Sequence, residues 1–326
     1  MVKGWFVGTM PDLNQDNQYL MTYLTQQSIW WIEHTGIDGI RMDTYVYASR
    51  DAMIGWVKAV KKEYPDFFIV GETWLHAPSY EGYWQARDDV ANADGYNSGL
   101  QSVSDFPLYY AIDKSFGKNE GLYKLYEVLT QDFTYPDASQ NKIFIDNHDV
   151  DRFFYAVGED ISKLKMALTF LFTTRGMPQL FYGTEILMNG HGEDGIKRAD
   201  FPGGWEGDER NAFISEGRTE AENEAFNFMQ KLLNWRKSHT QLFSEGGLTH
   251  FMPVDDVYVY SRFTDEERIV VILNGNSADQ TIDLTKRYGE FVSSYSSATD
   301  VVSGIEIMDF TNISMKAQSA LILELK

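Results

Sequence analysis

Two acidic residues, Asp43 and Glu72, each follow a short apolar run and are candidates for acid–base chemistry. The runs, residues 37–42 and 67–70, contain several β-branched or aromatic side chains, as strands do. Glycoside hydrolysis needs such a pair, because one carboxyl must protonate the leaving oxygen while the other carboxylate attacks the sugar or activates water. The sequence therefore indicates this chemistry, provided that the two runs are neighbouring strands of one sheet.

A predicted helix over residues 49–62 separates the two runs, and its apolar residues recur near helical spacing. Strand, helix and strand in this order form a βαβ unit, whose crossover makes the two strands parallel. Parallel strands present their carboxyl ends at one edge, where α/β sheets and barrels carry their chemistry. Both acids are therefore expected at that edge.

A third predicted strand, residues 143–145, ends in the polar residues 146–149, which read Asp-Asn-His-Asp. A helix is predicted over residues 162–174, and another buried strand with its exit loop over residues 177–185. The repeat of strand, polar end and helix predicts a parallel α/β layout, either a barrel or an open sheet.

Upstream of these elements, residues 19–34 have a helical pattern that ends before Gly36. We expect this helix to pack against the sheet and assign Trp30 and Trp31 to the core. From residue 247 onward the pattern becomes short alternating strands without helices, which predicts an antiparallel β domain. The expected domains are therefore residues 1–243 and residues 244–326.

Composition excludes several classes of function. The net charge is −20 and no Lys/Arg cluster occurs, so a nucleic-acid partner is not expected. The absence of cysteine excludes disulfides, thiolate catalysis and zinc–sulfur sites. No apolar run approaches the roughly 20 residues that span a membrane. Aromatic residues make up 15% of the chain, which suits either sugar stacking or a large core.

Three segments resemble the motifs of the α-amylase family, glycoside hydrolase family 13. DGIRMD (residues 38–43) is similar to the motif that carries the family's nucleophile, and GETW (residues 71–74) to the one that carries its acid/base. FIDNHD (residues 144–149) is similar to the motif with the third acid. The resemblance therefore implies that Asp43 is the nucleophile, Glu72 the acid/base and Asp149 the third acid.

Further motifs extend the resemblance over almost the whole chain. GTMPDLN (residues 8–14) is similar to a motif of members near the neopullulanase, cyclomaltodextrinase and oligo-1,6-glucosidase groups. GMPQLFYG (residues 176–183) and RADFPGGW (residues 198–205) also match. The segment after Asp43 reads TYVYAS and lacks the Lys-His pair of many endo-acting α-amylases, which favours the same groups.

The resemblance also implies substrate-binding residues, namely Arg41, Trp74, Asn147 and His148. Arg41 would favour the charged form of Asp43, and Trp74 is a candidate stacking platform. The alternatives are a structural Arg41–Asp43 ion pair, a structural His148 and a Trp74 that packs in the core. No cofactor and no bound metal is expected.

The chain departs from the family pattern in one major respect, because it supplies only about the last five of eight barrel strands. The predicted fold class is α/β: the C-terminal part of a (β/α)8 TIM barrel followed by a small antiparallel β-sandwich. An open part-barrel exposes strand edges. The chain is therefore expected to be a fragment of a longer protein, to be covered at this edge by a second chain or by self-association, or to have rearranged. We expect the isolated chain to have little or no activity. The periplasm or the extracellular space is favoured over the cytoplasm, since the native N-terminus is expected further upstream.

Three functions remain open at this point. The first is a retaining hydrolase that cleaves α-1,4 bonds, and as an option α-1,6 bonds, in α-glucans such as maltodextrins, cyclodextrins, pullulan or starch. The second is a transglycosylase that acts on the same substrates. The third is an inactive glucan-binding fragment.

Overall fold

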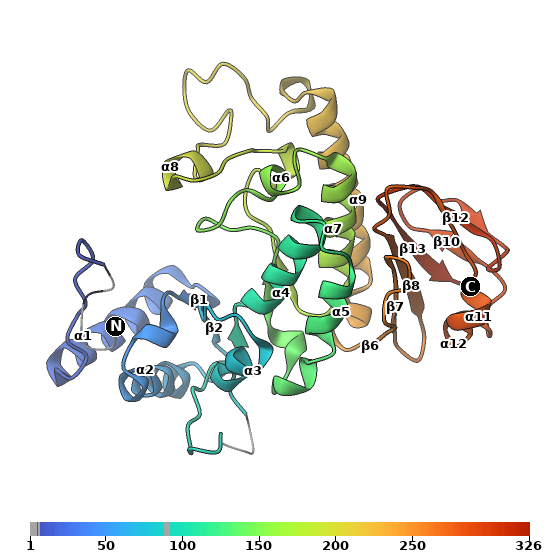
Figure 1. Cartoon of the computed structure of the whole chain (residues 1–326). Helices are drawn as coiled ribbons and strands as arrows, with labels where there is room; N and C mark the ends of the chain where they lie inside the picture. The colour runs from blue at the N-terminus through green and yellow to red at the C-terminus, as the bar shows by residue number, and fades with distance from the viewer. Residues whose placement is uncertain (1–4, 6, 88–91) are drawn as a thin grey trace. The chain divides into compact units, whose positions relative to one another are not determined.

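The structure is a computed structural model that describes residues 5, 7–87 and 92–326 (Figure 1). The chain divides into two compact units. The first is drawn from Met1–Pro107 and Gln131–Ile143, and the second from Leu108–Thr130 and Phe144–Lys326. Within the described residues, no helix is both long enough and apolar enough to cross a membrane.

The first unit contains a three-stranded sheet in the order β1-β2-β3. Its strands are β1 (Gly39–Met42), β2 (Phe68–Gly71) and β3 (Ser102–Val103), and both pairs are parallel. Helix α2 (Arg50–Glu63) connects β1 to β2, so the predicted βαβ unit is confirmed (Figure 1). Strand β1 is an edge strand of this sheet.

Two helices accompany the sheet, and both begin and end near the predicted residues. Helix α1 (Gln18–Thr35) starts after Asn17, whose side chain accepts hydrogen bonds from two backbone N–H groups, and ends at Gly36 in the left-handed conformation (φ 66°). This conformation favours glycine because a Cβ atom would be strained there. Helix α2 buries the apolar residues that gave it its helical pattern: Met53, Trp56, Val57 and Val60.

The assignment of Trp30 and Trp31 to the core is wrong, because the two residues are 49% and 47% exposed. Ile32 is the buried residue of α1. The two indole rings pack edge to face with centroids 4.8 Å apart, and Trp30 stacks on His34. A helical pattern identifies an apolar face, but it does not show whether another layer of protein covers that face.

Short helices complete the first unit. They are η1 (Tyr45–Tyr47), α3 (Pro78–Glu81), η2 (Gly82–Trp84), η4 (Asp132–Thr134) and η5 (Ala138–Gln140). Helix α4 (Phe106–Ile112) and strand β4 (Lys142–Phe144) lie where the chain passes from one unit to the other.

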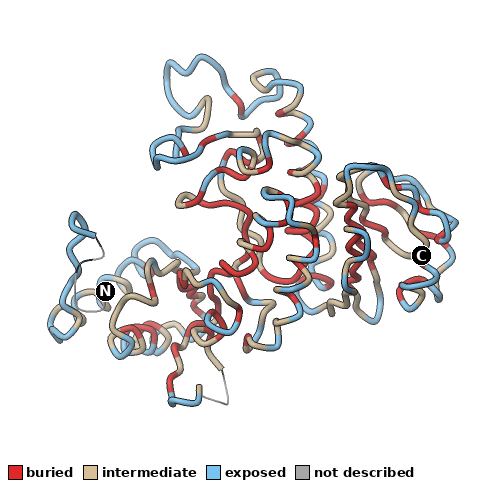
Figure 2. Tube along the Cα trace, in the orientation of Figure 1, coloured by how far each residue is buried: buried red, intermediate tan, exposed pale blue. Residues whose placement is uncertain are grey.

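The second unit is built around helices α7 (Ile161–Thr173) and α9 (Glu220–Ser238), which pack on each other. Most of α7 is buried, as Figure 2 shows. The remaining elements before the β domain are η3 (Asp113–Gly117), α5 (Tyr123–Leu129), α6 (Phe153–Ala156), β5 (Met177–Gln179), η6 (Thr184–Ile186), α8 (Asp194–Lys197), η7 (Ser215–Gly217) and α10 (Thr240–Ser244).

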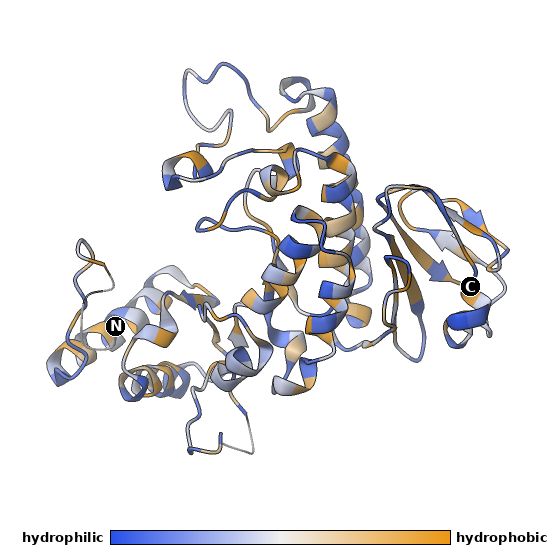
Figure 3. Cartoon of the chain, in the orientation of Figure 1, coloured by the Kyte–Doolittle hydropathy of each residue, from blue (hydrophilic) through white to orange (hydrophobic). Residues whose placement is uncertain are grey.

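A six-stranded sheet with the order β11-β10-β13-β8-β7-β6 forms the β domain, together with a two-stranded sheet of β12 and β9. All the pairings are antiparallel, as predicted. The strands are β6 (Gly247–His250), β7 (Val257–Phe263), β8 (Arg268–Asn274), β9 (Gln280–Ile282), β10 (Ala298–Asp300), β11 (Glu306–Ile307), β12 (Ile313–Met315) and β13 (Ser319–Leu325). The central strands β7, β8 and β13 are strongly hydrophobic (Figure 3).

The expectation that this domain lacks helices is wrong. It contains α11 (Leu284–Arg287) and α12 (Gly289–Val292). The Asp283 side chain accepts a hydrogen bond from Thr285 N–H at 3.0 Å and so starts α11. The apolar pair that ends α12 is buried in the core of the domain. A short apolar run at such a site cannot be assigned to strand or helix from periodicity alone.

Gly71, the last residue of β2, has no room for a side chain. A Cβ atom there would lie 2.5 Å from Leu100 Cδ1 and 3.3 Å from Tyr45 Cγ, both in the core. We predict that Gly71→Ala lowers the free energy of unfolding by about 1–3 kcal/mol. Gly55→Ala, in the interior of α2 with open space around it, should instead raise it by about 0.5–1 kcal/mol. Urea unfolding of both variants tests this, and equal effects would contradict the packing argument.

A second prediction concerns the start of α9, where Glu222 completes a capping box with Thr219. Arg210 donates to both Glu222 carboxylate oxygens at 2.7 and 2.9 Å. Burial acts to raise the pKa of Glu222, but the bonds from Arg210 and Thr219 outweigh it and hold that pKa below its usual value. A lowered folded-state pKa gives stability that is present above the unfolded-state pKa and is lost as the pH falls.

Glu222→Gln should therefore cost about 1 kcal/mol of unfolding free energy at neutral pH. The difference from the wild type should shrink as the pH falls below the usual glutamate pKa, and it should disappear only below the lowered pKa of folded Glu222. Thermal unfolding across this pH range measures both effects, with Glu220→Gln, an exposed acid in the same first turn, as the control. A constant difference at all pH values would show that the charge is not responsible.

Candidate active site

The two predicted acids lie directly after neighbouring strands, and the side chain of Arg41 joins them. Asp43 follows β1 and Glu72 follows β2. Arg41 Nη1 donates to Asp43 Oδ1, and Arg41 Nη2 donates to Glu72 Oε1. Residues two apart on a strand point to the same face, so β1 directs Arg41 and Asp43 together. The prediction that Asp43 and Glu72 share one edge of the sheet is confirmed.

Thr44 contributes to the same site, although no sequence pattern pointed to it. Its backbone N–H donates to Glu72 Oε2 at 2.9 Å. Its φ angle of 47° lies in the left-handed region, which a β-branched residue rarely adopts. Such strain persists where surrounding contacts enforce it, and it is common at functional sites. Backbone bonds from Glu72 N–H to Met42 O (2.8 Å) and from Tyr45 N–H to Glu72 O (3.1 Å) fix the turn.

The two carboxylates have different environments. The Asp43 side chain is 59% exposed, whereas that of Glu72 is 7% exposed. Both oxygens of Glu72 accept hydrogen bonds, from Arg41 and from Thr44. A general acid must carry a proton on one oxygen, and each Glu72 oxygen has a second lone pair besides the one that accepts its hydrogen bond. The exposed Asp43 is open to an attacking role.

Trp74 packs its indole on the Phe106 ring, with centroids 4.6 Å apart and planes 12° from parallel. The indole is only half-buried. One face of Trp74 is therefore occupied within the protein, and any sugar would have to stack on the other face. This arrangement is compatible with both the stacking and the core interpretation of Trp74.

The second unit holds the other predicted residues in a turn after β4. Asn147 Oδ1 accepts hydrogen bonds from the backbone N–H groups of Asp149 (2.8 Å) and Val150 (3.2 Å). This contact makes Asn147 a turn former, whatever else it does. Asp149 lies 3.2 Å from His148 Nε2 and 3.1 Å from an Arg198 Nη atom. Substrate binding by Asn147 and His148 stays a prediction.

Lys197 and Arg198 hold this turn from a distant part of the chain. Lys197 Nζ donates to the Asp149 carbonyl at 3.0 Å, and Arg198 Nε donates to the His148 carbonyl at 2.9 Å. Lys197 is buried. Arg198 lies in the RADFPGGW segment, so that motif was a signal for it, but nothing in the sequence indicated Lys197.

Beneath the turn, Asp146 and Arg152 form a buried scaffold. Asp146 accepts a hydrogen bond from Phe153 N–H at 3.0 Å, and burial raises its pKa to about 6. Arg152 Nε donates to the Lys197 carbonyl at 2.8 Å, and its guanidinium lies 3.9 Å from the Phe181 ring centroid. Asp146 therefore supports the loop.

Arg41, Asp43, Glu72 and Trp74 belong to the first unit, whereas residues 147–149 belong to the second. The meeting of all three acids in one pocket stays a prediction. Among the described residues, no cluster of three or more His, Asp or Glu side chains is arranged to hold a metal ion.

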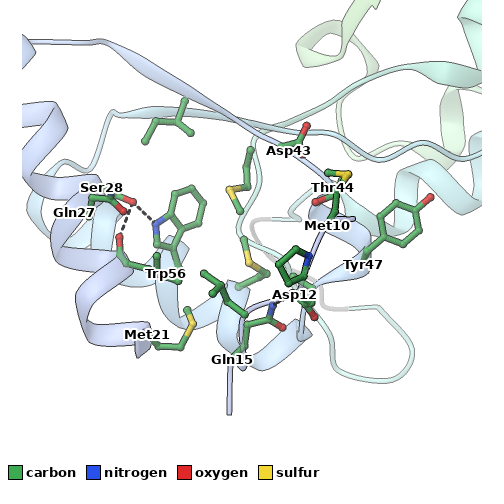
Figure 4. A pocket seen from close by; sticks show the side chains of 17 residues that line it. Met10, Asp12, Gln15, Met21, Gln27, Ser28, Asp43, Thr44, Tyr47 and Trp56 are labelled. Atoms are coloured by element: carbon green, nitrogen blue, oxygen red, sulfur yellow. Dashed lines mark hydrogen bonds between the residues drawn. The ribbon is translucent and has the colours of Figure 1, made fainter. Parts of the chain in front are cut away.

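A groove of about 440 Å³ runs beside the acid pair, along the edge of β1. Figure 4 shows Asp43 and Thr44 at one side of it, and Trp56 with its hydrogen-bond partner Ser28 at another. Ile40 and Met42 of β1 line it together with side chains from the first loop, α1 and α2: Met10, Pro11, Leu13, Met21, Leu24 and Met53. The edge of β1 is thus bordered by a largely apolar groove.

Comparison with known proteins identifies the parts of the chain. The protein-family model described as "Alpha amylase, catalytic domain" matches residues 4–258. A second family model, described as "Cyclo-malto-dextrinase C-terminal domain", matches residues 248–324. The predicted fold class, a C-terminal part of a (β/α)8 barrel followed by an antiparallel β domain, is confirmed by these matches and by the similar solved structures.

Relatives with known activities cover most of this chain. It is 30% identical to a cyclomaltodextrin glucanotransferase of Bacillus licheniformis over 83% of its length, and 26% identical to a cyclomaltodextrinase of Thermoanaerobacter pseudethanolicus over 87%. The chain spans only 34% and 45% of these two proteins.

A solved α-amylase structure is also similar to this chain. The α-amylase of Geobacillus thermoleovorans, crystallised with acarbose, superposes with a TM-score of 0.82 at 27% identity and covers all of this chain and 68% of its own. Because the catalytic-domain match extends over well more than half of the sequence, the chain belongs to the α-amylase family.

Proposed function

We propose that this chain carries the reacting groups of a retaining glycoside hydrolase that cleaves α-1,4 glucosidic bonds, with α-1,6 bonds as a further option, in α-glucans. The observation that supports this most is the Arg41 side chain, which contacts both Asp43 and Glu72. A retaining mechanism needs two carboxyl groups about 5–5.5 Å apart. A single guanidinium that bonds both groups keeps them within such a span.

In this proposal Asp43 attacks the anomeric carbon and Glu72 first protonates the leaving oxygen, then activates water. Asp149 and His148 bind hydroxyl groups of the distorted sugar, with Asn147 and Trp74 as further contacts. The partial catalytic barrel comprises residues 1–243 and the β domain residues 244–326. The names of these two relatives refer to cyclomaltodextrins, which are α-glucans. This supports maltodextrins, cyclodextrins, pullulan or starch as the substrate class.

Transglycosylation is the second candidate, and the similarity to cyclomaltodextrin glucanotransferases favours it. Both reactions share the glycosyl-enzyme intermediate and differ in whether water or a sugar hydroxyl accepts the glycosyl group. Product profiles of the native-length protein on cyclodextrin, pullulan and starch separate them, because new longer oligosaccharides arise only by transfer.

The third candidate is a glucan-binding fragment without activity. Asp43 is exposed, and the chain spans less than half of its curated relatives. We therefore expect the 326-residue chain alone to show little or no turnover of a soluble α-glucan. Hydrolysis at the rates of complete family members would contradict this expectation.

In the native-length protein, Glu72→Gln should lower kcat about 10²–10⁴-fold, because the proton donor is lost. Asp43→Asn should lower it at least as much, because the nucleophile is lost. Asp51→Asn, at an exposed acid in the first turn of α2, is the control and should leave kcat unchanged. Full turnover by Asp43→Asn would overturn the proposed mechanism.

We also propose that further polypeptide, a second chain or a second copy of this one, covers the edge of β1 and its groove. The groove is largely apolar, and α1, which lines it in part, carries the exposed Trp30 and Trp31. Exposed apolar surface of this kind is typical of interaction sites.

If a second copy covers this edge, the mass of the 326-residue chain in light scattering should rise with concentration from one copy to two. Met42→Lys should then abolish the rise, because it places a charge in the groove, while Lys58→Glu on the exposed side of α2 should not. A single-copy mass at every concentration would exclude self-association and leave a separate chain as the partner.

A further inference from the structure

A buried acid, Glu81, lies behind the turn that carries Glu72. It ends α3 and is completely buried. Its Oε1 atom accepts a hydrogen bond from the Thr73 hydroxyl. Its Oε2 atom has no hydrogen-bond partner in the described part of the chain.

A second acid, Asp105, is also fully buried, and its negative charge acts on Glu81. Ser104 N–H donates to Gly71 O at 3.0 Å, which places the chain around Asp105 beside the end of β2. The Tyr135 hydroxyl donates to Asp105 Oδ1 at 3.3 Å. Burial, and then the charge of Asp105, raise the pKa of Glu81 well above its usual value.

These surroundings disfavour a charged Glu81. A buried carboxylate is stable when a cation or several donors neutralise it. Glu81 Oε1 accepts from the Thr73 hydroxyl, Oε2 has no donor in the described part of the chain, and the acidic neighbour repels a negative charge. A neutral carboxyl group loses much less free energy on burial than a carboxylate does.

The neighbours of Glu81 connect it to the acid pair. Thr73 directly follows Glu72 and is itself fully buried. Gly82, next to Glu81, has no room for a Cβ atom, which would lie 2.4 Å from the Thr134 carbonyl oxygen. The end of α3 is therefore pressed against the residues around η4 and provides a rigid anchor for the turn.

We propose that Glu81 is a neutral carboxylic acid that acts as a positioning residue for Glu72, by fixing the turn through Thr73. The importance of this for turnover rests on the proposed function of Glu72. The protonation of Glu81 and the geometry of the turn do not depend on the proposed function, because both can be measured in the 326-residue chain without substrate.

The first experiment tests the protonation. Infrared spectra at neutral pH should contain a protonated carboxyl C=O band that is absent from Glu81→Gln. Labelling glutamate with ¹³C should shift this band. A band that does not shift would place the proton on an aspartate such as Asp105, and the absence of any band would show that Glu81 is ionised; either result overturns the proposal.

The second experiment tests the positioning. The ¹³C carboxyl resonance of Glu72, assigned by its loss in Glu72→Gln, should move by more than its linewidth in Thr73→Val and in Glu81→Ala. In Glu81→Gln the Glu72 resonance should stay at its wild-type position, since the neutral amide keeps an oxygen that accepts the Thr73 hydrogen bond. Glu63→Gln, an exposed acid at the end of α2, is the control.

Thr73→Val removes only a hydroxyl group, so it keeps the test valid if Glu81→Ala does not fold. An unmoved Glu72 resonance in Thr73→Val would overturn the proposal, and so would equal shifts in Glu81→Gln and Glu81→Ala. If the resonances behave as expected while Glu72→Gln in the native-length protein keeps full turnover, the proposed function fails and the positioning inference stands.

Discussion

One guanidinium group, that of Arg41, bonds two carboxylates at the ends of neighbouring strands, and the acid pair of the first unit depends on it. Asp43 and Glu72 would repel each other across the edge of the sheet without a cation between them. Arg41 supplies that cation from the same strand as Asp43, so the parallel pairing of β1 with β2 fixes all three groups at once. The left-handed conformation of Thr44 completes the site by directing a backbone N–H at Glu72.

The second unit also positions an acid at a strand end, but with a turn and basic side chains. Its acid, Asp149, is held by a turn that Asn147 closes and that basic side chains from residues 197–198 secure. Buried Arg152 and Asp146 lie under the turn and tie it to the segments on either side. In both units, a polar residue at a strand end is positioned by several hydrogen-bond partners, which is what a precise site needs.

Features that follow from periodicity and chain order could be predicted from the sequence. The βαβ unit, the limits of α1 and α2 and the place of Asp43 and Glu72 at one edge could all be predicted, because the crossover leaves the two strands no other relation. Thr44 and the pair of Glu81 with Asp105 could not, because a left-handed residue and a buried acid depend on distant neighbours. Trp30, Trp31 and the helix α12 were misjudged for a related reason, since an apolar pattern does not show what lies opposite it.

The position of β13 in its sheet has a consequence for how the protein is made. This strand lies between β10 and β8, although it follows every other strand in the sequence. During synthesis on the ribosome, β6, β7 and β8 emerge before β13, so β8 has an unpaired edge until β13 is released. The β domain can therefore close only late in translation, and in the interval its nascent strands are open to pairing with other chains.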